Sequence, residues 1–242
     1  MSAFIKKLEQ ISRTKGRSIG FGASVKANDA SMMLVARLFQ ADAGAVSLAV
    51  EGKADALLFD LADPGANIDA LSEITGSIPW GVRLRTGGAD EVKRFSEEGC
   101  DYFVFDPSLP VLILDRDGVG KVLEVDTALG DGVARTIAQT PIDVLFITED
   151  TQVESLAIAQ LLNYQRICGF SGKIALVNLP QDLADLALLR EAGVGGVVVE
   201  CDKGSERKVV EVREAIAALP VSMKKGKGGT DPLLPNASAV TE

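Results

Sequence analysis

Short apolar segments alternate with longer segments of helical spacing along almost the whole chain. The apolar segments are continuous runs of Val, Ile, Leu and Phe, which is typical of strands buried on both faces of a parallel sheet. The pattern predicts eight strands, over residues 32–39, 54–61, 80–86, 101–106, 121–127, 143–148, 173–178 and 196–201. Helical spacing predicts helices over residues 42–51, 67–74, 90–98, 131–139, 153–167, 181–191 and 206–218, with a short apolar crossover at 108–117.

A weak internal repeat supports this alternation. Odd-numbered strands lead into an Asp suited to capping a helix, in LVARLFQAD, GVRLRTGGAD, LEVDTALGD and ALVNLPQD. Even-numbered strands follow a glycine and an acidic turn, in GKADALLFD, GCDYFVFD and AGVGGVVVE. Repeated strand–helix units imply right-handed crossovers and a parallel sheet. A doubly wound open sheet is the alternative, but eight units in 242 residues favour a single (β/α)8 TIM barrel.

Two segments lie outside the repeat and divide the chain into residues 1–31, a barrel over 32–221 and a tail over 222–242. Residues 2–15 have Phe4, Ile5, Leu8 and Ile11 on one side of an amphipathic helix, which we expect to cover the bottom of the barrel or to pack against a partner subunit. The following SIGFG run is too close to the next strand to be a barrel strand itself. The tail is rich in Gly and Pro and is predicted to be flexible.

The net charge of −9 argues against a nucleic-acid or membrane-surface partner, because both need clustered Lys and Arg. No apolar run reaches the roughly 20 residues that span a bilayer, and residues 2–16 do not resemble a signal peptide. Three widely spaced cysteines suggest neither a disulfide framework nor a zinc site, so we expect a cytoplasmic protein. The sequence is compatible with a homo-oligomer.

The chain contains no histidine, which excludes Ser-His-Asp and Cys-His catalysis and histidine metal sites. Barrel enzymes place their active sites at the C-terminal ends of the strands. The polar residues at these ends are Arg37, Asp60, Arg83, Arg85, Asp106, Glu124, Asp126, Thr148, Glu149, Asn178, Glu200 and Asp202. Arg83 and Arg85 share one face of their strand, as do Glu124 and Asp126, and we expect that face to point inward.

These residue types suggest that arginines at the C-terminal mouth of the barrel bind a carboxylate or phosphate group of a ligand. The neighbouring carboxylates of the protein would move protons or hold Mg²⁺. We therefore expect Asp60, Asp106, Glu124 and Asp126 to be catalytic, and Glu124, Asp126 and Glu149 to be candidate Mg²⁺ ligands. The candidate substrate-binding residues are Arg37, Arg83, Arg85, Asn178, Gly204 and Ser205. The alternative is an internal network of salt bridges, because buried charges need partners.

Other chemistry has less support. The third loop, RTGGAD, and the eighth, ECDKGSERK with Gly204 and Ser205, could present backbone N–H groups to an anion, although plain turns or helix caps explain both. The seventh loop, NLPQDL, lacks glycine. Lys26, which precedes the first strand, is the only candidate for a Schiff-base lysine. Cys201 is better explained as a small buried residue than as a nucleophile.

The phrases EGKADALLFD, REAGVGGVVVE and EEGCDYFVFD resemble the aldolase-type TIM-barrel superfamily, in which a helix ending in Ala-Gly or Glu-Gly precedes a strand with a polar end. The likeness covers about residues 32–220 and is at the level of the fold, without a specific family. Among its branches, Mg²⁺ lyases of pyruvate-like acids use an Arg and two carboxylates, roles that Arg85, Glu124 or Asp126, and Glu149 could fill. Phosphosugar isomerases and synthases are the neighbouring branch.

Two functional hypotheses follow. The first is an enzyme of small anionic metabolites, of lyase or isomerase type, which uses carboxylates as acid and base with Mg²⁺ as a candidate cofactor. The second is a non-catalytic barrel that serves as a binding or assembly subunit. The missing histidine and the two appended segments fit the second hypothesis as well as the first.

Overall fold

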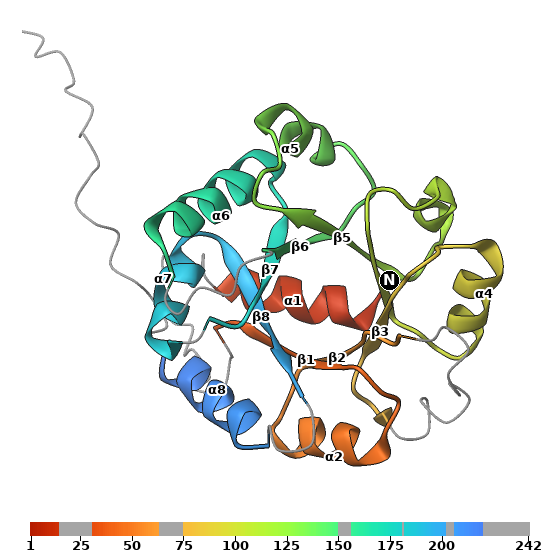
Figure 1. Ribbon diagram of the computed structural model, residues 1–242, viewed down its shortest axis with the longest axis horizontal. Helices are drawn as coiled ribbons and strands as arrows, with labels where there is room; N and C mark the ends of the chain where they lie inside the picture. Colours follow the sequence, from red (N-terminus) through yellow and green to blue (C-terminus); the bar gives the residue numbers. More distant parts are fainter. Residues whose placement is uncertain (15–30, 63–74, 150–155, 181, 202–205, 220–242) are drawn as a thin grey trace, which may run out of the picture.

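A computed structural model describes residues 1–14, 31–62, 75–149, 156–180, 182–201 and 206–219. Eight parallel strands, each hydrogen-bonded to the next in sequence and the last to the first, form a closed barrel (Figure 1). This confirms the predicted (β/α)8 fold. The strands are β1 (Met33–Leu38), β2 (Ala56–Phe59), β3 (Trp80–Arg83), β4 (Tyr102–Phe105), β5 (Gly120–Asp126), β6 (Val144–Thr148), β7 (Ile174–Asn178) and β8 (Val194–Glu200).

Helices form an outer ring around the barrel (Figure 1). They are α2 (Ala43–Glu51), α4 (Ala89–Glu97), α5 (Asp131–Ile137), α6 (Ile158–Ser171), α7 (Leu186–Glu191) and α8 (Glu206–Ala218), with the short 3-10 helices η1 (Val111–Asp115) and η2 (Leu183–Asp185). A further helix, α1 (Ala3–Thr14), precedes the barrel.

The predicted boundaries needed correction at three connections. The helix expected over 153–167 begins at Ile158 and extends to Ser171, because Gly172 ends it in the left-handed conformation, with φ of 61°. The crossover at 108–117 contains only the 3-10 helix η1, which follows Pro110. The stretch 181–191 contains η2 and then α7 in place of one helix. The helix expected over 67–74, the SIGFG run and the tail lie outside the described residues.

Alternate side chains of each strand separate two apolar layers, as the sequence pattern predicts. Val82, Leu84, Leu123 and Val125 pack in the outer layer, between the strands and the helices. The barrel interior contains a separate cluster: Met33, Val35, Ala56, Leu58, Tyr102, Val104, Val122, Val144, Phe146, Leu176 and Val198. The polar residues two positions farther along these strands therefore point inward at the C-terminal end.

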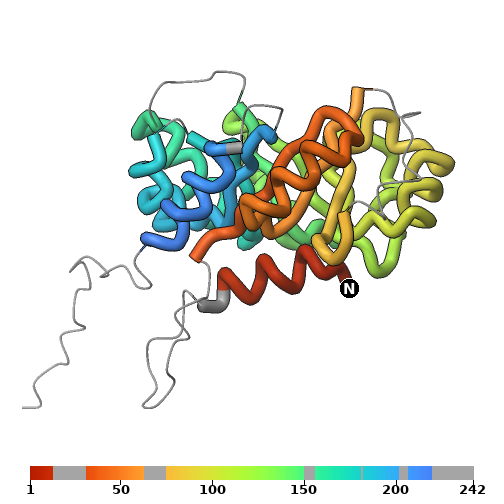
Figure 2. Tube along the Cα trace, turned by 90° about the horizontal axis from the view of Figure 1, so that it is seen from below, coloured from red at the N-terminus to blue at the C-terminus, as the bar shows by residue number. Residues whose placement is uncertain are grey.

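Helix α1 closes the N-terminal end of the barrel, one of the two roles expected for it (Figure 2). Phe4 packs with the interior cluster and stacks on Tyr102, with ring centroids 4.0 Å apart. The Asp101 carboxylate caps the helix by accepting hydrogen bonds from the backbone N–H groups of Ala3 (2.8 Å) and Phe4 (2.7 Å). Within the described residues, no helix combines the length and the apolar character needed to cross a membrane.

Candidate functional site

The C-terminal mouth of the barrel contains two levels of polar side chains, whose positions follow from the strand register. Arg37 of β1 lies beside Leu58 of β2, and Leu58 lies beside Gly81 of β3. Because barrel strands are tilted, inward residues of alternate strands reach the same height. The odd strands therefore contribute one level, formed by Arg37, Arg83, Glu124 and Asn178. The even strands contribute the next level, formed by Asp60, Asp106, Thr148 and Glu200.

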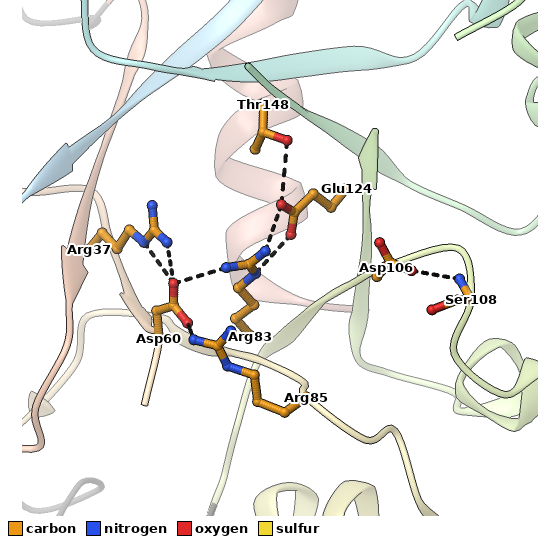
Figure 3. A network of polar contacts seen from close by, with 8 residues as sticks. All are labelled: Arg37, Asp60, Arg83, Arg85, Asp106, Ser108, Glu124 and Thr148. Carbon is orange, nitrogen blue, oxygen red and sulfur yellow. Dashed lines mark hydrogen bonds and ion pairs between the residues drawn. The ribbon is translucent and has the colours of Figure 1, made fainter. Parts of the chain in front are cut away.

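Asp60 is the centre of the charged cluster, and three arginines converge on it (Figure 3). Its side chain is only 1% exposed. One carboxylate oxygen, Oδ2, accepts from Arg37 through Nε at 3.0 Å and through Nη2, and from Arg83 Nη1 at 3.3 Å. The other oxygen, Oδ1, accepts from Arg85 Nη2. Both oxygens of Asp60 are thus occupied by positively charged donors.

Arg83 links Asp60 to Glu124 across the mouth. Its Nε and Nη2 atoms donate to the two oxygens of Glu124, at 2.8 and 2.7 Å, in the bidentate geometry that favours arginine. Thr148 Oγ1 lies 3.4 Å from Glu124 Oε1. Burial lowers the pKa of Arg83, but the charges of Glu124 and Asp60 outweigh burial, so the pKa is raised overall. Arg83 is therefore a fixed cation, and both carboxylates are held by it.

Arg37 and Arg85 retain donors that Asp60 does not use. Arg37 reaches Asp60 only through Nε and Nη2, and Arg85 only through Nη2, so Nη1 of Arg37 and both Nε and Nη1 of Arg85 make no hydrogen bond among the described residues. The Arg85 side chain is 42% exposed. Arg37 also lies over the ring of Phe39, with its guanidinium carbon 4.9 Å from the ring centroid. The cluster therefore has three cations for two anions.

Asp106 and Asp126 do not join this cluster, although they occupy equivalent positions in the repeat. Asp106 Oδ1 accepts from the backbone N–H of Ser108 at 2.8 Å, and Asp126 Oδ1 accepts from that of Ala128 at 2.7 Å. Each carboxylate thus folds back onto its own loop and is exposed. Hydrogen bonds from Ser108, and secondarily the charge of Arg83, lower the pKa of Asp106. Matching repeat positions predict that five side chains converge: Arg37, Asp60, Arg85, Asp106 and Asp126. The structure brings together only Arg37, Asp60 and Arg85 of these five.

The expected Mg²⁺ ligands are also kept apart. Glu124 is bound by Arg83, and Asp126 is turned into its loop. Glu149 lies on the outward face after β6, where it accepts a hydrogen bond from Gln160 of α6. Burial, and then the charge of Glu149, raise the pKa of neighbouring Tyr164. Among the described residues no three acidic, Cys or His side chains form a metal-binding group.

The loops give a further correction. In the third loop, the carboxylate of Glu91 accepts from the backbone N–H of Thr86 (3.3 Å) and Gly87 (2.8 Å) and from the Thr86 hydroxyl (2.6 Å). The chain's own glutamate therefore occupies the backbone donors that were candidates for an anion site. Asn178 is exposed at the end of β7, and Gly204 and Ser205 lie outside the described residues.

Glu200 is exposed at the end of β8, paired in register with Arg37. The sequence identified it as a strand-end residue without giving it a role. Its position leaves an exposed carboxylate on the opposite side of Arg37 from Asp60, because β8 and β2 flank β1.

Comparison with known proteins supports the fold and no more. No family model and no curated protein matches the chain. Among solved structures, thiamine phosphate pyrophosphorylase from Pyrococcus furiosus is 14% identical with a TM-score of 0.60, over 76% of this chain and 95% of that one. This likeness, like the two that follow, shows the (β/α)8 fold alone. A mutant tryptophan synthase alpha-subunit from P. furiosus is 15% identical (TM-score 0.60, 76% and 96% covered), and tryptophan synthase from M. tuberculosis is 13% identical (TM-score 0.60, 90% and 96% covered).

Proposed function

We propose that the protein is an enzyme of small anionic metabolites, and that Arg37 and Arg85 bind the anionic group of its substrate. The observation that carries this proposal is the excess of positive charge around Asp60. Three arginines share two carboxylates, and Nη1 of Arg37 and Nε and Nη1 of Arg85 are left without a partner among the described residues. A second carboxylate or a phosphate satisfies such donors with short, charge-assisted hydrogen bonds.

The reaction type that fits these residues is that of a lyase or isomerase, in which a carboxylate moves a proton. Asp60 and Glu124 are poor candidates for this step, because arginines occupy both oxygens of each. Asp106 is the better candidate, because its carboxylate is exposed and accepts from the backbone of its own loop, with no arginine bound to it. Two structural neighbours are named as a pyrophosphorylase and a synthase, which supports an enzyme without indicating a substrate.

A non-catalytic binding or assembly subunit is the second candidate. One observation favours it: Asp60 and Glu124 are fully paired, as in a network whose role is to satisfy the polar centre of the barrel. The two candidates differ in the role they give to Arg85. In an enzyme it binds ligand, whereas in a structural network its only role is to neutralise Asp60.

The test is the Arg85→Ala variant, titrated with inorganic phosphate and with succinate by isothermal titration calorimetry. Loss of a charge-assisted hydrogen bond should weaken anion binding by about tenfold or more. The matched control is Lys93→Ala on α4, which removes an exposed positive charge at a distance from the mouth and should leave binding unchanged. Absence of binding to the wild type, or equal binding by Arg85→Ala and the wild type, would contradict the proposal.

A further inference from the structure

Arg37 lies between two carboxylates and binds only one of them. Asp60, on its β2 side, accepts from Arg37 Nε at 3.0 Å and from Nη2. Glu200, on its β8 side, is paired in strand register with Arg37 and points inward, two positions after the interior residue Val198. Nη1 of Arg37 points away from Asp60 (Figure 3). Within the described part of the chain, neither this Nη1 nor the Glu200 carboxylate makes a hydrogen bond or ion pair.

The salt-bridge network occupies one side of the mouth and leaves the other side free. Arg83 joins the two carboxylates of the network across strands β2 to β5. On the side from β7 to β1, the strand ends contribute Asn178 and Glu200, which are both exposed. The Asn178 side chain, like that of Glu200, has no hydrogen-bond partner among the residues that the structure describes. Because β7, β8 and β1 are neighbours, an amide, a carboxylate and the unused donor of Arg37 follow one another around the mouth.

Glu200 restricts which ligand can bind to Arg37. An anionic group on Nη1 of Arg37 would lie beside the Glu200 carboxylate, because the two residues are directly opposite each other on adjacent strands. A carboxylate has only acceptors, so it repels a second anionic group of the ligand and attracts a hydrogen-bond donor. Asn178, one strand farther on, is uncharged and offers one more acceptor. The group next to the ligand's anion should therefore be a donor.

The charge balance of the mouth favours a positively charged donor over a neutral one. The three arginines exceed Asp60 and Glu124 by one charge, and Glu200 balances this excess on the other side of Arg37. Asp106 and Asp126 add two exposed carboxylates at the same end of the barrel. A ligand with only negative charges would be attracted by the arginines and repelled by these carboxylates, whereas a ligand that carries both signs can match both.

We propose that the substrate is an amino acid, whose ammonium group binds to Glu200 and Asn178 while its carboxylate binds to Arg37. This inference rests on the proposed function, in which Arg37 and Arg85 bind the anionic group of the substrate. Adjacent strands are about 5 Å apart, and an α-amino acid carries its ammonium and carboxylate groups on one carbon atom, so the two groups can reach neighbouring strands. The three donors of the ammonium group match acceptors on Glu200 and Asn178 and leave one for water.

The test compares succinate with L-aspartate, which adds only an ammonium group, by isothermal titration calorimetry on the full chain. The wild type should bind L-aspartate about tenfold more tightly than succinate, because of the added charge-assisted hydrogen bond. L-Malate, which has a hydroxyl group in place of the ammonium group, should bind more weakly than L-aspartate. Glu200→Gln should weaken L-aspartate binding by about tenfold and strengthen succinate binding, because it removes both the attraction and the repulsion. The control is Glu97→Gln at the end of α4, an exposed carboxylate distant from the mouth, which should change neither affinity.

The opposite shifts in Glu200→Gln separate recognition of an ammonium group from a structural role. If Glu200 only neutralised Arg37, its loss would strengthen the binding of both acids, and damage to the fold would weaken both. Shifts in the same direction therefore overturn the inference, as does L-aspartate that binds no more tightly than succinate or L-malate. The proposed function survives these results if succinate binds and Arg85→Ala weakens its binding. If the wild type binds neither phosphate nor any of the three acids, the proposed function fails together with this inference.

Discussion

The two ends of the barrel use the same residue types for different purposes. At the N-terminal end, the carboxylates of Asp55, Asp101 and Asp143 accept from backbone N–H groups, Asp55 from Leu34 (2.9 Å) and Asp143 from Lys121 (2.8 Å). Asp55 also pairs with the side chains of Lys7 and Arg213. At the C-terminal end, the carboxylates of the central cluster accept from arginine side chains. Backbone donors are fixed by the fold, whereas a guanidinium has five donors and can bind a second anion. A carboxylate held by backbone donors alone can only stabilise, whereas an arginine that keeps unused donors, such as Arg37 or Arg85, can also bind a ligand.

Apolar packing also differs between the two ends of the barrel. Helix α1 seals the N-terminal end with Phe4, Ile5, Leu8 and Ile11, all of which are buried. At the mouth, the inward-facing side chains are charged or polar, and Arg83 and Glu124 are partly exposed beside the buried Asp60. Stability should therefore depend most on the sealed end, and ligand binding on the mouth.

The largest effect on stability is expected from Phe4→Ala. Phe4 is fully buried and stacked on Tyr102, so truncation should lower the free energy of unfolding by about 3–5 kcal/mol. Urea denaturation measures this change, and phosphate binding by the folded protein should be unaffected. A loss below about 1 kcal/mol would mean that α1 is not part of the cooperative core.

A smaller but still large effect is expected from Asp60→Ala, which removes the anion that three arginines share. Breaking a buried ion pair costs about 3–5 kcal/mol, and we expect about 2–3 kcal/mol here because Arg85 is partly exposed and water can solvate it. Thermal or urea denaturation measures the loss. Asp106→Ala is the matched control, because its exposed carboxylate holds only its own loop. Equal effects of the two substitutions would show that Asp60 is not the centre of the cluster.

Much of the fold could be predicted from the sequence, because burial on both sheet faces leaves a direct mark in continuous apolar runs. The inward direction of Arg83 and Glu124 followed from alternation with Val82 and Leu123, which pack outward. The missed boundaries depend on single residues. Gly172 allows α6 to extend to Ser171, and Pro110 introduces a 3-10 helix in the fourth crossover.

The candidate site was less predictable, since register does not determine which partner a carboxylate chooses. Asp60 and Asp106 share a repeat position, yet Asp60 binds three arginines and Asp106 binds its own loop. A local signal was available, because Asp-Pro-Ser at 106–108 is a typical turn sequence. Glu91 also carried a signal: it stands three residues after Gly88, the N-cap of α4, where a glutamate reaches back to free N–H groups.

The smallest effect on stability is expected at Asp106, whose carboxylate is bound by its own loop, in contrast to carboxylates that are bound by arginine side chains. Hydrogen bonds from the Ser108 hydroxyl, and then from its backbone N–H, lower the pKa of Asp106 below its ordinary value of 3.8. A lowered pKa in the folded state stabilises the protein at any pH above the unfolded-state pKa, and this stabilisation is lost as the pH falls through the folded-state pKa.

Ser108→Ala should therefore raise the pKa of Asp106, which NMR titration of its carboxyl carbon measures. Because the carboxylate is exposed, the cost at pH 7 should be no more than about 0.5 kcal/mol and should vanish once Asp106 is protonated in both states. An unchanged pKa in Ser108→Ala would mean that the groups which the substitution leaves in place, the backbone N–H of residue 108 and the charge of Arg83, control Asp106.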